Sequence, residues 1–70
     1  MQVAHDYGLV RIVHSGLDIC VEIKRNDQWE FYSSYNMMSD DYAHTHAKES
    51  AGRAIKSMAA EAAAKLSVDK

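Results

Sequence analysis

The sequence predicts an α+β fold in which a three-stranded antiparallel β-meander is covered on one face by one long C-terminal α-helix, in the order β-β-β-α. Three short runs rich in β-branched and aromatic side chains alternate with turn-forming residues. The runs are LVRIVH (9–14), DICVEIK (18–24) and WEFYSSY (29–35). From about residue 40, apolar side chains recur every three or four positions, which is the spacing of one helix face. An antiparallel sheet can leave its second face open to solvent.

The two expected hairpins are tested by where their turns place the apolar side chains. We expect the first to turn at Ser15-Gly16 and the second at the three-residue loop 25–27. The second turn then pairs Ile23 with Trp29, whereas a slip of one residue would place Ile23 opposite Glu30 and turn the last strand over. The expected register gathers one apolar set on the covered face: Val10, Ile12, Ile19, Val21, Ile23, Trp29 and Phe31.

A helix is predicted to start at Ser39 or Asp40, either of which is a suitable N-cap, and to end near Leu66. The charges of Asp40 and Asp41 suit the positive end of the helix dipole. Gly52 costs about 1 kcal/mol relative to alanine in mid-helix, which predicts that another element packs close to it. The expected core stripe is Ala47, Ala51, Ile55, Met58, Ala62 and Leu66. A second close-packing surface is expected from Ala43, Ala54, Ala59 and Ala63.

We expect one small domain over residues 1–70, with 1–7 either flexible or a short strand extension and 67–70 a frayed tail. A chain of this size is marginal in the core it can bury, and Cys20 is its only cysteine, so no internal disulfide can support it. The sequence shows no basic leader and no run of about 18 apolar residues, which predicts a cytoplasmic protein that does not contact membranes.

Charge and residue types argue against two classes of function. The net charge is −2 and the basic residues are scattered, whereas nucleic-acid binders usually carry a basic stripe, so direct nucleic-acid contact is not expected. Cys20 lies in mid-strand beside Arg11 in the expected register, without the base that a nucleophile requires. Glu22 and Glu30 are expected to be neighbours on the open face, and we interpret them as solvated or as charges that await a basic partner. The chain is therefore not predicted to be an enzyme.

The stretch DDYAHTHAKE (40–49) raises the question of a metal site. On a helix, His44 and His46 point to opposite sides because they are two residues apart. His44 could converge only with Asp40 or Asp41, and two ligands do not make a structural zinc site unless a distant residue such as His5 completes it. We therefore expect neither a metal nor a cofactor.

A protein interface remains as the expected function. The open face should carry it, through Leu9, Arg11, Val13, Glu22, Glu30 and Tyr32. In size, charge and fold type the chain resembles the small accessory proteins of phages and mobile elements, many of which bind and block a host enzyme. We expect a non-catalytic module that binds and inhibits or modulates a host protein complex, or that pairs with itself as a homodimer. The alternative is a nucleic-acid-associated regulator, antitoxin-like or RNA-contacting, that uses Lys48, Arg53 and Lys56.

Overall fold

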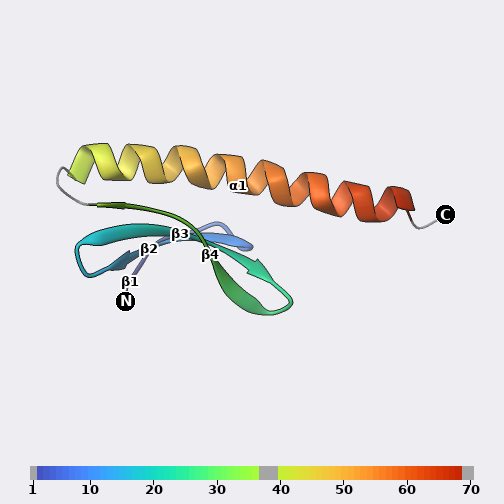
Figure 1. Ribbon diagram of the computed structural model, residues 1–70, viewed down its shortest axis with the longest axis horizontal. Helices are drawn as coiled ribbons and strands as arrows, with labels where there is room; N and C mark the ends of the chain where they lie inside the picture. Colours follow the sequence, from blue (N-terminus) through green and yellow to red (C-terminus); the bar gives the residue numbers. More distant parts are fainter. Residues whose placement is uncertain (1, 37–39, 69–70) are drawn as a thin grey trace.

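A computed structural model describes residues 2–36 and 40–68, which form four strands followed by one long helix (Figure 1). The elements are β1 (Gln2–Asp6), β2 (Val10–Ser15), β3 (Asp18–Arg25), β4 (Gln28–Asn36) and α1 (Asp40–Val68). The strands form one antiparallel sheet in the order β1-β2-β3-β4, and α1 lies along one face of it. The predicted α+β fold is confirmed, with four strands in place of three. The predicted cap at Ser39 lies outside the described residues, and so do residues 69–70 of the predicted tail.

The additional strand, β1, comes from the N-terminal segment and pairs with β2. A tight turn joins the two strands: the Gly8 N–H donates to the Asp6 carboxylate at 2.8 Å, and the Tyr7 N–H donates to the Val10 carbonyl at 2.8 Å. Gly8 has a φ of +89°, a conformation that glycine adopts without steric cost. The sheet edges are therefore β1 and β4, and β2 is not the edge strand that a three-stranded meander would make it.

The first predicted hairpin turns one residue later than expected, at Gly16-Leu17, and Gly16 has a φ of +61°. The expected turn would have paired Ile12 with Ile19, but Ile12 lies opposite Val21. This shift of two residues is even, so it leaves each side chain on its expected face. The β2 and β3 part of the apolar set is buried under α1 as predicted: Val10, Ile12, Ile19, Val21 and Ile23.

The predicted register of the second hairpin is wrong. Asn26 and Asp27 form a two-residue turn with φ values of +52° and +64°, as a type I′ turn requires, and Ile23 lies opposite Glu30. A β-bulge then adds one residue to β4, because Val21 pairs with position 33 while its neighbour at 22 pairs with position 31.

The bulge switches the face that β4 presents to the helix. Before it, Trp29 and Phe31 lie on the open face, and Phe31 is 69% exposed, so the prediction that both belong to the covered face is wrong. After it, Ser33 and Tyr35 lie toward α1 and are partly buried. The two-residue turn shifts the register by one residue, and the bulge shifts it by one more. Residues of β4 before the bulge therefore lie on the face opposite to the predicted one, whereas residues after it return to the predicted face.

The core lies between the sheet and the first half of α1. Four alanines of α1 are fully buried against the β2 and β3 face: Ala43, Ala47, Ala51 and Ala54. Beside them Ser50 is buried, and its Oγ lies 2.6 Å from the Oγ of Ser33, a hydrogen bond that ties α1 to β4. The prediction that Ala43 and Ala54 form a separate outer surface is wrong, because the helix packs on its smallest side chains.

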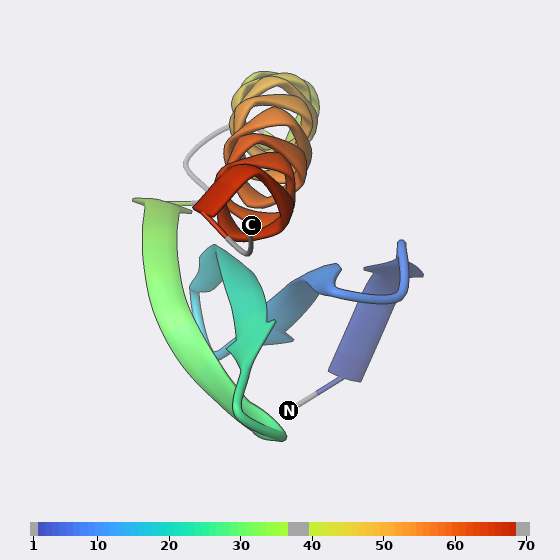
Figure 2. The same ribbon diagram turned by 90° about the vertical axis from the view of Figure 1, so that its right-hand side faces the viewer.

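The second half of α1 extends past the sheet (Figure 1), and an end-on view shows the helix over one face of the sheet (Figure 2). At about 1.5 Å per residue its 29 residues span about 44 Å. The longest strand has nine residues and spans about 30 Å. The predicted core stripe holds at Met58, which packs against the core, but it fails at Ile55 and Leu66, which are 42% and 77% exposed.

Enlarging a buried alanine tests the close packing of α1 on the sheet. Ala47→Leu adds three carbons at a fully buried position, so we expect a loss of about 1–3 kcal/mol in the free energy of unfolding, measured by urea denaturation. Ala60→Leu makes the same change at an exposed position of the helix and should change stability by less than about 0.5 kcal/mol. Equal effects of the two substitutions would contradict this packing.

Gly52 provides a second test, because the expected close packing around it is not present. Within the described chain, no heavy atom lies within 4 Å of the position that a Cβ would take, apart from the local helix backbone. Gly52→Ala should therefore raise the free energy of unfolding by about 1 kcal/mol through helix propensity alone. A loss of stability in the same urea titration would show that another group does occupy this space.

Candidate functional site

Three of the six predicted interface residues contribute to the sheet's own open face. Arg11 Nε lies 2.7 Å from the Glu22 carboxylate, and the two side chains are only 20% and 19% exposed. The Arg11 guanidinium carbon also lies 4.0 Å from the ring centroid of Trp29, within the range of a cation–π contact. Val13 is 1% exposed although it lies outside the core under α1. The groups on this part of the face are therefore largely satisfied within the chain.

The other three predicted residues lie elsewhere. Glu30 stands near the second hairpin turn, 3.5 Å from the Arg25 guanidinium. Tyr32 is the extra residue of the β4 bulge and is 37% exposed. Leu9 precedes β2, is 56% exposed and lies beneath α1 instead of on the open face. The six residues do not form one surface, and a binding role for any of them stays a prediction.

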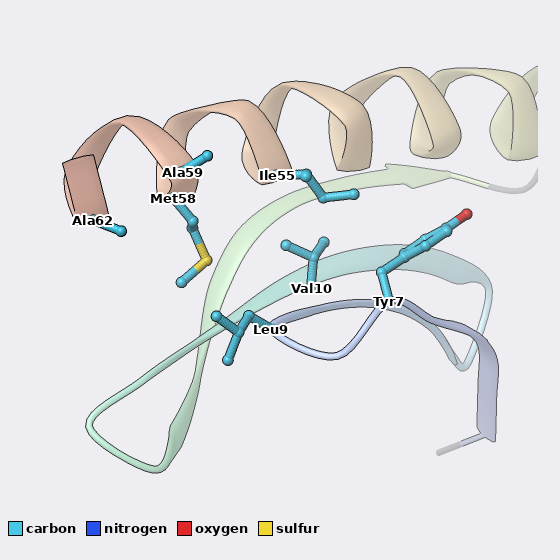
Figure 3. Close-up of a pocket in the computed structure, with 7 residues that line it drawn as sticks. All are labelled: Tyr7, Leu9, Val10, Ile55, Met58, Ala59 and Ala62. Carbon is cyan, nitrogen blue, oxygen red and sulfur yellow. The ribbon is translucent and has the colours of Figure 1, made fainter.

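An apolar groove of about 280 Å³ opens where α1 leaves the sheet (Figure 3). Met58 points down from α1 toward Leu9, while Tyr7 and Val10 point up from the sheet side. The lining comes from the turn between β1 and β2 and from residues 55–62 of α1: Tyr7, Leu9, Val10, Ile55, Met58, Ala59 and Ala62. The sequence contained one signal of this groove, a predicted helix much longer than any predicted strand, which left part of its apolar stripe without a sheet to cover.

A second hollow of about 290 Å³ adjoins the first and shares Leu9, Met58 and Ala62 with it. Its remaining lining is polar: Lys24, Arg25, Asn26, Glu61 and Lys65. An ion pair between Arg25 and Glu61 links the second hairpin to α1 across this hollow. The site therefore combines an apolar groove with a charged rim on the side of the β3–β4 turn.

The histidines are separated by the fold. His44 lies beside His14 of β2, with ring centroids 5.3 Å apart, and His14 is half-buried. His46 instead contacts Tyr35 of β4, at 5.7 Å between ring centroids. The two helix histidines thus contact different strands, in agreement with their spacing, and His5 stacks beside Tyr7. Among the side chains that the structure describes, which do not include Asp40, no three His, Cys, Asp or Glu groups gather closely enough to hold a metal ion.

The surroundings of Cys20 do not favour a nucleophilic role for its thiol. Burial raises the pKa of the Cys20 thiol, and the charges of Asp18 and Glu22 raise it further. A raised pKa reduces the thiolate fraction at neutral pH, which is the opposite of what a nucleophile needs. Cys20 lies opposite Val13 and not beside Arg11 as expected.

Glu22 and Glu30 are not the cross-strand neighbours that the expected register makes them. Glu22 is paired with Phe31, and Glu30 with Ile23. The expected register failed here because the second hairpin turns in two residues and not in three. Glu22 and Glu30 bind different arginines, Arg11 and Arg25, so they do not form an acid–base pair with each other.

Comparison with protein-family models, with curated proteins and with solved structures returns no match. No helix within residues 2–36 and 40–68 is long and apolar enough to cross a membrane. The proposed function therefore follows from the geometry of the site.

The raised pKa of Cys20 predicts slow alkylation of the native protein. The iodoacetamide rate at pH 7.5 should be lower for the folded chain than for the same chain in urea, because less thiolate is present and the thiol is partly covered. The midpoint of the rate against pH should also lie higher in the folded chain. A faster native reaction, or a lower midpoint, would contradict the assigned environment.

Proposed function

We propose that this protein is a small non-catalytic protein-binding module that occupies a partner's surface, with the groove beneath the second half of α1 as its main contact. One observation carries this proposal: α1 leaves the sheet while it still presents apolar side chains. Ile55 and Leu66 are exposed on the helix, and Leu9 is exposed below it. Monomeric soluble proteins rarely expose contiguous apolar patches of more than roughly a few hundred Å², and such patches commonly mark interaction sites.

The composition of the groove supports a protein partner. Tyrosine and methionine are enriched at protein interfaces, and Tyr7 and Met58 both line the groove. Methionine can also adapt its shape to a contact surface. A domain of 70 residues buries a small share of its surface by itself, so a partner that covers the groove would add to its stability.

The biological setting that we propose is a phage or mobile-element accessory protein that inhibits or modulates a host complex in the cytoplasm. Its support is an analogy of size and fold type. A binding module of this kind needs a rigid scaffold and one contact surface, and it needs no catalytic residues. The core under the first half of α1 supplies the scaffold, and the groove supplies the contact surface.

A nucleic-acid-associated regulator is the second candidate. Lys48, Arg53 and Lys56 are all exposed on α1, which is the observation that favours it. This candidate requires binding to mixed oligonucleotides that weakens steeply with salt, because phosphate contacts release counterions. No binding at low salt would remove it.

Affinity capture with matched variants tests the proposed function. We expect the wild-type chain to retain a protein from the source cell's lysate, and Leu9→Glu to lose it because a charge enters the apolar groove. Tyr32→Glu changes an exposed residue of the β4 bulge and should keep the protein. Circular dichroism must show that both variants are folded. Loss with Tyr32→Glu alone would move the contact to the sheet, and equal capture by all three chains would contradict the proposal.

A further inference from the structure

We infer that the groove binds one amphipathic helix of a partner protein, and that this helix carries acidic side chains beside its apolar face. The inference rests on the proposed function and specifies the chemistry of the partner. It follows from the spacing of the exposed apolar residues on α1, from the shape of the groove and from the charges around it.

The exposed apolar residues of α1 recur at the spacing of a helix-packing surface. Ile55, Ala59, Ala62 and Leu66 are separated by four, three and four residues, which is the repeat that packs one helix against another in a coiled coil. Three of these four residues line the groove, and Leu66 continues the row at 77% exposure. The row is thus a helix-packing seam that no element of the described chain covers.

The shape of the groove also suits a helix. The centre of the seam is formed by Ala59 and Ala62, which are small enough for another helix to approach α1 closely. Leu9 and Tyr7 form the opposite wall, so the site is a groove about 280 Å³ in volume and not a flat helix surface. A helix that lays its apolar face into such a groove uses anchor residues three and four apart, which matches the seam.

Basic side chains flank the seam. In heptad spacing, Lys56 follows Ile55 and Lys65 precedes Leu66, so these lysines occupy the positions that flank the seam. Glu61 is the only acidic residue of the sequence between positions 50 and 66, and it is ion-paired with Arg25. Charges at the flanking positions set partner choice, so a complementary partner must bring carboxylates.

A second copy of the chain is a poorer match than an acidic helix. It would bring Lys56 and Lys65 to a seam that lysines already flank, and its single acid in this stretch, Glu61, is already paired. Like charges across an interface suppress a pairing. The observed charges therefore favour a different protein as the occupant.

Two synthetic helical peptides test the inference directly. Both carry leucine at the seam positions, and they differ only in having glutamate or lysine at the flanking positions. Titrated into the ¹⁵N-labelled full chain, the glutamate peptide should bind at least about tenfold more tightly at low salt. Its amide shifts should concentrate at Leu9 and along residues 55–66. Leu66→Glu should abolish these shifts while the core amides keep their positions.

A charge reversal provides the matched control. Lys56→Glu combined with Lys65→Glu should reverse the preference, so that the lysine peptide binds more tightly. Lys48→Glu combined with Arg53→Glu makes the same change of charge at exposed helix positions outside the groove, and it should retain the preference for the glutamate peptide.

Three outcomes would overturn the inference: equal binding of the two peptides, no binding of either, or a concentration-dependent dimer of the free chain that Leu66→Glu abolishes. The capture experiment separates these results from failure of the proposed function. If the wild-type chain captures a protein that Leu9→Glu does not retain, the groove remains a binding site, and only the inference of an acidic helical partner fails. If no captured protein depends on Leu9, the proposed function fails with it.

Discussion

The close packing of an alanine face of α1 on a valine and isoleucine face of the sheet is the constraint on which the rest of the structure depends. Alanine at 43, 47, 51 and 54 leaves room for the β-branched side chains of β2 and β3 between the two backbones. The hydrogen bond between Ser33 and Ser50 holds β4 to the same helix face. Because this contact uses only the first half of α1, it also determines which residues remain uncovered.

The candidate site follows from a difference in length. The helix is longer than the sheet it packs on, so its apolar residues continue past the part of α1 that the sheet covers (Figure 1). The turn between β1 and β2 places Leu9 and Tyr7 under this overhang and closes one side of the groove. On the other side, the ion pair between Arg25 and Glu61 links the hairpin to the helix. The apolar groove with its charged rim thus results from how far α1 extends past the sheet and from where the turns between strands lie.

The sequence predicted the fold better than it predicted the site. Alternation in β2 and β3 identified the covered face correctly, because the observed shift in the first hairpin is even. Asn26 and Asp27 both tolerate positive φ, so a turn there is in agreement with the local sequence, but its length was taken as three residues and not two. The bulge at Tyr32 has no signal in the local pattern. Helical spacing also could not say which alanines pack inward, since alanines occur on several sides of α1. Leu9 was identified as an interface residue but assigned to the open face, because it was expected to belong to the first strand, whereas it lies in the turn that joins β1 to β2.

Hydrogen exchange of the isolated chain tests the central claim most directly, because it reports residue by residue which part of α1 is held by the sheet. Amides of residues 47–54 should exchange only through global unfolding, whereas those of residues 59–66 should exchange through local fraying and show far weaker protection. Equally strong protection through Leu66 in dilute monomer would contradict the account, because it would mean that the second half of α1 is buried. Weak protection at residues 47–54 would contradict it as well, because the alanine contact would then not hold the helix.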